Sequence, residues 1–160
     1  MKIISHRGNL NGPNLHLENS IEYIQNAINM NFIVEIDVRF QNNNLYLGHD
    51  FPQYLIDKQW IIDRSNRLLL HTKDSYALEY IIDLNIPNIV FFSHQNDDFS
   101  FISNGYIWTH NINYITSKSI IPLINEYDSI LYENCYGICT DYPLEYRKKL
   151  NSYYSNNSIW

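Results

Sequence analysis

The chain has 160 residues, of which 45% are hydrophobic and 18% are charged, and its formal net charge is −6 at pH 7. This composition predicts one globular domain over residues 1–160 with a substantial core, and it argues against a disordered chain. Basic residues cluster only at 147–149, no apolar run is long enough for a bilayer, and no signal peptide follows Met1. We therefore expect a cytoplasmic protein with no nucleic-acid binding and no integral membrane association.

The first predicted elements are a strand and a helix joined by a loop. Residues 2–5 are mostly apolar and predict a short strand that ends at His6. Asn19 can cap the helix that follows, because Glu22 stands where a capping-box side chain reaches back to the cap. Isoleucines recur on one face of residues 20–30, so this segment is predicted to be an amphipathic helix.

A strand that carries two carboxylates comes next. Residues 33–38 alternate apolar and acidic side chains, which is typical of a strand. Glu35 and Asp37 are two positions apart and so point to the same face. Their mutual repulsion requires compensation, which either a bound cation or solvation of an exposed strand end can supply. The polar turn at 42–44 predicts a hairpin that brings His49 beside this pair.

The rest of the chain alternates predicted strands and helices, with no repeat and no internal domain boundary. Further strands are expected at residues 67–73, 88–93, 106–109, 119–123 and 136–140. Helices are expected near 59–62, after a cap at Asp74 and from Pro143 onward, with Asp141 as a cap and residues 151–160 as a polar tail.

This alternation predicts an α/β fold with a parallel sheet. Polar residues follow the ends of the predicted strands, where both β/α barrels and doubly wound open sheets place their functional groups. These residues are His6, Asp37, His71, Lys73, His94, His110 and Asp141. No glycine-rich phosphate loop follows a strand, which disfavours nucleotide-binding folds. The strand pattern alone leaves the barrel and the open sheet as alternatives.

Five short motifs, in this order, resemble the glycerophosphodiester phosphodiesterases, a family within the phosphoinositide-phospholipase-C-like β/α barrels. The motifs are His6-Arg7-Gly8, Glu18-Asn19-Ser20, Glu35-Ile36-Asp37, His49-Asp50 and Gly137-Ile138-Cys139-Thr140-Asp141-Tyr142-Pro143. The resemblance covers the first half and the last strand, and residues 85–135 carry little of it. It implies a short, divergent branch with a compact, reduced TIM-type β/α barrel whose helices are shortened or missing, because a full barrel takes about 250 residues.

The resemblance also implies the parts of a site. It implies that Glu35 and Asp37 are metal ligands and that His6 and His49 form the acid–base pair. It also implies that Arg7 contacts the phosphate. Where the family usually has a glutamate as third metal ligand, this chain has His71, and Lys73 on the same strand face is a second candidate phosphate contact. The expected cofactor is one divalent cation, Mg²⁺, Ca²⁺ or Mn²⁺, with Mn²⁺ favoured if the imidazole is a ligand.

Other residues are candidates for supporting contacts or for the pocket wall. Asp50 can orient the histidine before it or only cap the turn, and Asn19 can serve the site or act only as a helix cap. Glu18 is a candidate by its position in the motif. His94 and Trp108 can line a pocket, with loop or core packing as the alternative.

The predicted function is metal-dependent cleavage of a small phosphodiester, such as a glycerophosphodiester or a sugar phosphodiester. His49 is the preferred acid, because Asp50 should raise its pKa, and His6 is the preferred base. In the family the nucleophile is often the substrate's own neighbouring hydroxyl. One alternative is a weakly active or inactive protein that binds a phosphorylated glycan or lipid headgroup. Another is a lyase at a membrane surface, which the lack of a basic patch or amphipathic anchor disfavours.

Overall fold

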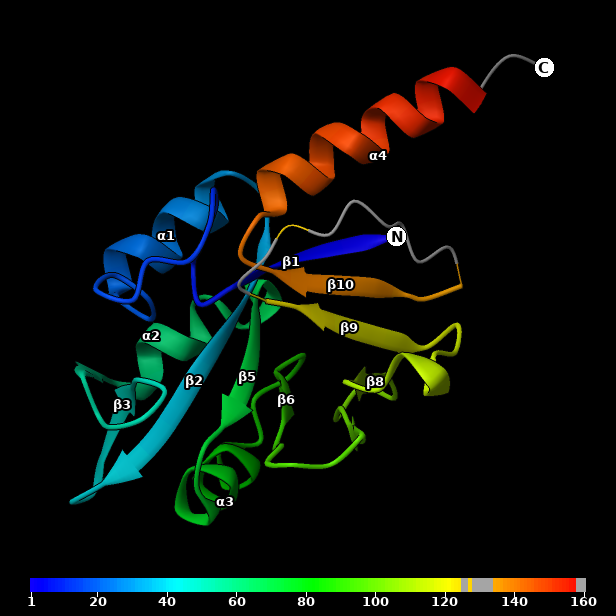
Figure 1. Cartoon of the computed structure of the whole chain (residues 1–160). Coiled ribbons are helices and arrows are strands. Elements are labelled where there is room, and N and C mark those ends of the chain that lie inside the picture. Colours follow the sequence, from blue (N-terminus) through cyan, green and yellow to red (C-terminus); the bar gives the residue numbers. More distant parts are fainter. Residues whose placement is uncertain (125–126, 128–133, 158–160) are drawn as a thin grey trace.

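The computed structural model describes residues 1–124, 127 and 134–157, and the strands in this part of the chain form one strongly curled sheet (Figure 1). Its main part, within the described residues, is a row of seven parallel strands: β1 (Lys2–His6), β2 (Ile33–Gln41), β5 (Leu68–Thr72), β6 (Val90–Phe92), β8 (Ile107–Thr109), β9 (Ser119–Leu123) and β10 (Gly137–Thr140). Their order across the sheet is β6-β5-β2-β1-β10-β9-β8. The N-terminal strand therefore lies in the middle of the row.

Antiparallel strands are added to this row in two places. The far end of β2 pairs with β3 (Asn44–Leu47), which pairs in turn with β4 (Tyr54–Ile56). The turn between β2 and β3 is formed by Asn42 and Asn43, whose φ angles of 51° and 63° are typical of a tight hairpin. The predicted hairpin is confirmed. The second addition, β7 (Phe99–Phe101), pairs with β8, and neither β4 nor β7 was predicted.

The helices are α1 (Ile21–Asn29), α2 (Lys58–Ile62), α3 (Ser75–Leu84) and α4 (Pro143–Asn157), with short 3₁₀ helices η1 (Ser65–Arg67) and η2 (Ile112–Tyr114). Asp74 caps α3 as predicted, since its Oδ1 accepts a hydrogen bond from Ala77 N at 2.8 Å. The cap of α1 is Ser20 and not Asn19, because Ser20 Oγ accepts from the backbone of Tyr23.

The closing helix is longer than expected, because α4 includes the predicted polar tail as far as Asn157. Helix α4 continues through these residues and projects away from the sheet (Figure 1). Polar side chains at 151–155 are compatible with a helix when it is exposed, and this part of α4 is exposed. Residues 158–160 lie outside the described part of the chain. None of the described helices has the length and apolar character that a membrane crossing requires.

The predicted reduced TIM-type barrel is wrong. Such a barrel closes its ring of parallel strands and places a helix after each of them. Here, within the described residues, β6 pairs only with β5 and not with β8, so the sheet is a mixed, curled half-barrel. The link from β6 to β8 contains β7, and the link from β8 to β9 contains only η2. A strand thus takes the place of a covering helix in the first link, and the second link is too short for such a helix with its turns, so sheet rather than helix dominates the fold.

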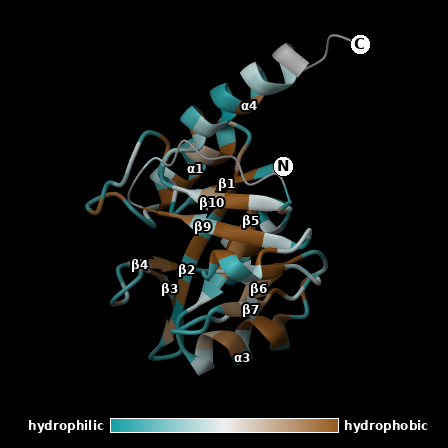
Figure 2. Ribbon diagram, turned by 45° about the vertical axis from the view of Figure 1, so that its right-hand side comes forward, coloured by the Kyte–Doolittle hydropathy of each residue, from teal (hydrophilic) through white to brown (hydrophobic). Residues whose placement is uncertain are grey.

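Side chains of the sheet pack into three apolar clusters, one of which joins Ile121 of β9 and Ile138 of β10 to Tyr146 of α4. The outer face of β2 and β5 packs against α1, α2 and α3 through Val34, Ile36, Val38, Leu68 and Leu70. The inner face holds a second apolar layer of Ile4, Leu69, Phe92, Trp108, Ile120 and Cys139. Figure 2 shows β1, β9 and β10 as mainly hydrophobic and the loops and outer half of α4 as mainly hydrophilic. Polar residues on the inner face, beyond this apolar layer, form the site described next.

Candidate functional site

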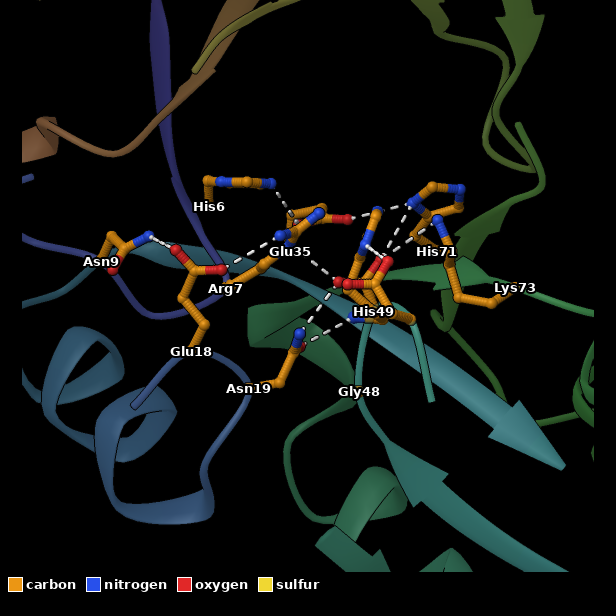
Figure 3. A network of polar contacts seen from close by, with 12 residues as sticks. His6, Arg7, Asn9, Glu18, Asn19, Glu35, Gly48, His49, His71 and Lys73 are labelled. Carbon is orange, nitrogen blue, oxygen red and sulfur yellow. Dashed lines mark hydrogen bonds and ion pairs between the residues drawn. The ribbon is translucent and has the colours of Figure 1, made fainter. Parts of the chain in front are cut away.

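Strand register brings the predicted metal ligands together on the inner face. Asp37 of β2 lies beside His71 of β5, and Glu35 of β2 lies beside His6 of β1. Because side chains alternate along a strand, Glu35 and Asp37 point the same way, as predicted. One ligand atom from each of Glu35, Asp37 and His71, here called the acidic cluster, lies within 4.8 Å of the other two (Figure 3).

The acidic cluster contains buried carboxylate oxygens that lack hydrogen-bond partners within the described structure. Glu35 is 1% exposed and Asp37 is fully buried, yet Glu35 Oε2 and Asp37 Oδ1 accept no hydrogen bond. His71 Nδ1 lies 3.3 Å from Asp37 Oδ1 and 3.5 Å from Glu35 Oε1. Buried charged oxygens without partners are costly. Two carboxylates and an imidazole that converge in this way fit one divalent cation.

The charge balance around the acidic cluster also favours a bound divalent cation. Buried carboxylates outnumber permanent cations in the connected network: the carboxylates are Glu18, Glu35, Asp37 and Asp141, and the cations are Arg7 and Lys73. With neutral histidines this network carries two net negative charges, which one divalent cation would balance.

Without a cation, the imidazole of His71 balances part of the negative charge of the two carboxylates. Burial lowers the pKa of His71, but its close polar contacts with the Asp37 and Glu35 carboxylates outweigh burial and raise that pKa to about 9. Burial likewise raises the pKa of Asp37, whereas His71, Arg7 and Lys73 together hold it well below its usual range. The metal-free cluster therefore keeps an ionised Asp37 beside an imidazolium.

Arg7 and Asn19 hold Asp37 from the side of β1. Arg7 Nε lies 2.8 Å from Asp37 Oδ2, and its Nη1 donates to Glu18 Oε2 at 3.0 Å. Asn19 Nδ2 donates to Asp37 Oδ2 at 2.9 Å, and Asn19 Oδ1 accepts from the Asp37 N–H at 3.0 Å (Figure 3). Both Arg7 and Asn19 have left-handed φ angles, 52° and 62°. Such backbone strain in non-glycine residues is found preferentially at functional sites. Asn19 therefore contributes to the site directly.

A buried carboxylate holds His6. His6 Nδ1 lies 2.7 Å from Asp141 Oδ1, and the fully buried Asn9 donates from Nδ2 to both Asp141 and Glu18. Because the carboxylate accepts, Nδ1 carries the proton and Nε2 is left facing Glu35 Oε2, 3.9 Å away. Sequence reasoning missed this role of Asp141 and missed Asn9. Their positions just after β1 and β10 were the available signal.

His49 lies at the edge of this network. It follows Gly48, whose φ of 147° and close approach to Phe51 O exclude a side chain, and Arg39 donates to the carbonyls of both Gly48 and His49. His49 Nδ1 contacts Asp50 Oδ1 at 2.7 Å, and Asp50 is 81% exposed. Burial lowers the pKa of His49 and the charges on Arg7 and Lys73 lower it further, more than Asp37 and Asp50 raise it. Asp50 thus raises the pKa of His49 as expected, but the net shift of this pKa is downward.

One cavity of about 360 Å³ joins these groups. The predicted catalytic, phosphate and metal residues that line it are His6, Arg7, Glu35, His49, His71 and Lys73. Of the other candidates, His94 and Trp108 line the cavity, Glu18 and Asn19 support Arg7 and Asp37 from behind, and Asp50 is exposed at the rim. Larger hollows of about 410 and 560 Å³ elsewhere contain none of the acidic cluster, so cavity size alone does not identify the site.

The chain has no match among protein-family models, curated proteins or solved structures. The geometry of this site and the motifs in the sequence are therefore the basis for a proposed function.

Proposed function

We propose that the protein is a metal-dependent phosphodiesterase that cleaves a glycerophosphodiester or a similar small alcohol or sugar phosphodiester. The observation that carries this proposal is the acidic cluster itself. Two of its buried carboxylate oxygens accept no hydrogen bond within the described structure, and its Glu35 and His71 line the same cavity as two further histidines and the cations Arg7 and Lys73. A phosphodiester carries one negative charge and needs both fixed positive charge and proton transfer for cleavage, and this cavity offers both.

The acidic cluster is the proposed metal site, with Glu35, Asp37 and His71 as ligands. A divalent ion bound there supplies Lewis-acid polarisation of a phosphoryl oxygen. Lys73 Nζ lies 3.7 Å from Asp37 Oδ1, so its ammonium group adds positive charge at the same edge of the cavity. Arg7 directs Nε and Nη1 at carboxylates, which leaves Nη2 as a donor for phosphate.

The two histidines divide the proton transfers in this proposal. His6 is the base, because Asp141 holds the Nδ1 proton and leaves the Nε2 lone pair toward the cavity. His49 is the acid on the more exposed side, where an alcohol can depart. Its lowered pKa makes the protonated imidazole a stronger acid toward the leaving alkoxide.

The test is an assay with bis(4-nitrophenyl) phosphate and with glycerophosphodiesters in the presence of Mg²⁺, Ca²⁺ or Mn²⁺. We expect metal-dependent turnover, and a loss of about 10²-fold or more in Asp37→Asn. Asp83→Asn, an exposed change on α3, is the matched control and should leave the rate unchanged. Metal binding without turnover of any diester would reject the proposal in favour of a non-catalytic protein that binds a phosphorylated glycan or lipid headgroup.

A further inference from the structure

The cavity has two chemically different walls. One wall carries two members of the acidic cluster, Glu35 and His71, together with Arg7, Lys73 and the two proposed catalytic histidines, and Asp37 lies buried behind it. The other, here called the imidazole wall, consists of His94, Gln95, Trp108 and His110. Among the described residues that line the cavity, this second wall contributes no carboxylate and no lysine or arginine. Its chemistry is therefore suited to a different part of a ligand than the phosphate.

Stacked rings keep the imidazole wall rigid. Phe92 of β6 stacks on Trp108 of β8 with ring centroids 4.6 Å apart, and His94 stacks on His110 with centroids 4.1 Å apart. These contacts join the region of β6 to the region of β8, the two strands at the ends of the parallel row, which do not pair through their backbones. Rings fixed in this way lose little freedom when a ligand binds, so their polar edges are pre-organised.

The edges of these rings present hydrogen-bonding atoms to a ligand. Trp108 Nε1 donates to His110 Nε2 at 3.0 Å, so the His110 imidazole is neutral and carries its proton on Nδ1. His94 Nδ1 pairs with Ser100 Oγ at 2.9 Å, which leaves His94 Nε2. Within the described part of the chain, neither of these remaining nitrogens nor the exposed amide of Gln95 has a hydrogen-bond partner. Donors and acceptors of this kind match hydroxyl groups.

The imidazole wall is poorly suited to a cationic or an acyl group. A cation such as choline needs a carboxylate or an open aromatic face, but Trp108 is only 3% exposed and is covered by Phe92. An acyl chain would remove water from the nitrogen atoms and the amide without replacing their hydrogen bonds. A hydroxylated ring holds several hydroxyl groups in one arrangement and can meet more than one of these edges at a smaller entropic cost than an open chain.

The two walls meet at His71. His71 Nε2 contacts the carbonyl oxygen of His94 at 3.2 Å, and the two ring centroids are 6.3 Å apart. A substituent on a phosphate bound at the acidic cluster therefore reaches the imidazole wall within the length of one sugar ring. We propose that the imidazole wall is the subsite for a neutral, hydroxylated ring of monosaccharide size that is esterified to the phosphate. The placement of the phosphate rests on the proposed function.

The test measures binding without requiring catalysis. Calorimetric titrations with Mn²⁺ present compare glucose, galactose and mannose 1-phosphates with methyl phosphate and phosphocholine. We expect at least one sugar phosphate to bind about tenfold more tightly than methyl phosphate, and phosphocholine to show no such gain. Gln95→Leu and His110→Phe should each reduce this advantage about three- to tenfold, the range for one hydrogen bond, and leave methyl phosphate affinity unchanged.

Gln59→Leu on the exposed surface of α2 is the control and should behave as the wild type. The subsite would be overturned if all the phosphates bound with equal affinity, if phosphocholine bound more tightly, or if no phosphate bound. It would also be overturned if both variants lost the same affinity for sugar phosphates as for methyl phosphate. Turnover of diesters is measured separately. A sugar preference without turnover would reject the proposed function and support the subsite. Turnover without a sugar preference would support the proposed function and reject the subsite.

Discussion

His6 Nδ1 and Asp141 Oδ1 lie 2.7 Å apart in a buried contact, although 135 positions separate the two residues in the chain. His49 and Asp50 make the same contact at the same distance, but these residues are adjacent and Asp50 is 81% exposed. The two pairs thus share one geometry and differ in burial. Because of this difference, substitution of the exposed carboxylate is a control for substitution of the buried one.

We predict that Asp141→Asn lowers kcat about 10²-fold or more, because an amide no longer accepts the His6 proton in the same way. The substitution should also cost about 1–3 kcal/mol of unfolding free energy, since it disturbs buried hydrogen bonds. Asp50→Asn is the matched control, with a change below about 0.5 kcal/mol at an exposed site and a rate loss below about tenfold. Urea unfolding and steady-state rates measure both quantities. Equal losses in the two variants would contradict the assignment of Asp141 to the site.

Asp37→Asn should abolish stabilisation by divalent cations. The unpartnered, buried Asp37 Oδ1 is the atom that we expect to bind the ion, and ligands that bind only the folded state raise the melting temperature. Thermal melts with and without Mn²⁺ measure this shift in the wild type, in Asp37→Asn and in the Asp83→Asn control. The idea fails if Asp37→Asn retains the wild-type shift.

The identity of the third ligand can be tested through metal preference. An imidazole favours Mn²⁺ over Mg²⁺ more than a carboxylate does. We therefore expect His71→Glu to lower the ratio of Mn²⁺ affinity to Mg²⁺ affinity. The expected change is about tenfold, the smallest effect typical of substitutions at metal ligands and the residues that support them. Calorimetry with each ion gives the ratio. An unchanged ratio would show that His71 does not bind the ion.

The pH dependence of stability should differ between the metal-free and metal-bound protein. In the metal-free protein the pKa of His71 is raised to about 9, above its value of about 6.5 in the unfolded chain. The resulting stabilisation is fully present below about pH 6.5 and is lost as the pH rises through about 9. Mn²⁺ affinity should rise over the same range, because the ligand must lose its proton.

Chemical unfolding in EDTA from pH 6 to pH 9.5 measures the first of these trends, and calorimetric Mn²⁺ titrations over the same range measure the second. His71→Gln serves as the non-titrating control. If its pH profile in EDTA matched the wild-type profile, His71 would not be the titrating group.

The internal-nucleophile mechanism makes a prediction about substrates. A diester with a hydroxyl beside its ester oxygen should react and release a cyclic phosphate, whereas its O-methylated analogue should bind without reacting. The pH–rate profile should be bell-shaped, and His6→Ala and His49→Ala should each remove one limb or cost about 10²-fold or more. Phosphorus NMR identifies the product. Turnover of the methylated analogue at a similar rate would mean that water attacks directly.

The local features of this fold could be predicted because each depends on a few neighbouring residues. The alternation of residues 33–38 places Glu35 and Asp37 on one face whatever lies around them, since the side-chain period of a strand is two. The asparagine-rich turn at 42–44 and the cap at Asp74 are local in the same way. The two roles open to Asn19 could not be separated from the sequence, because a polar residue before a helix is compatible with a cap whether its side chain turns back to the helix or across to Asp37.

The sequence by itself thus determined most of the strand and helix pattern, the shared face of the two carboxylates and the motif residues that line the cavity. Only the tertiary structure decided that the sheet stays an open, mixed half-barrel, since the lack of pairing between β6 and β8 depends on how distant strands pack. It also decided that Asp141 contacts both His6 and Asn9 and that His94, Gln95 and His110 share a wall with Trp108. These contacts join residues far apart in the chain, and no local periodicity or capping pattern encodes which of them meet.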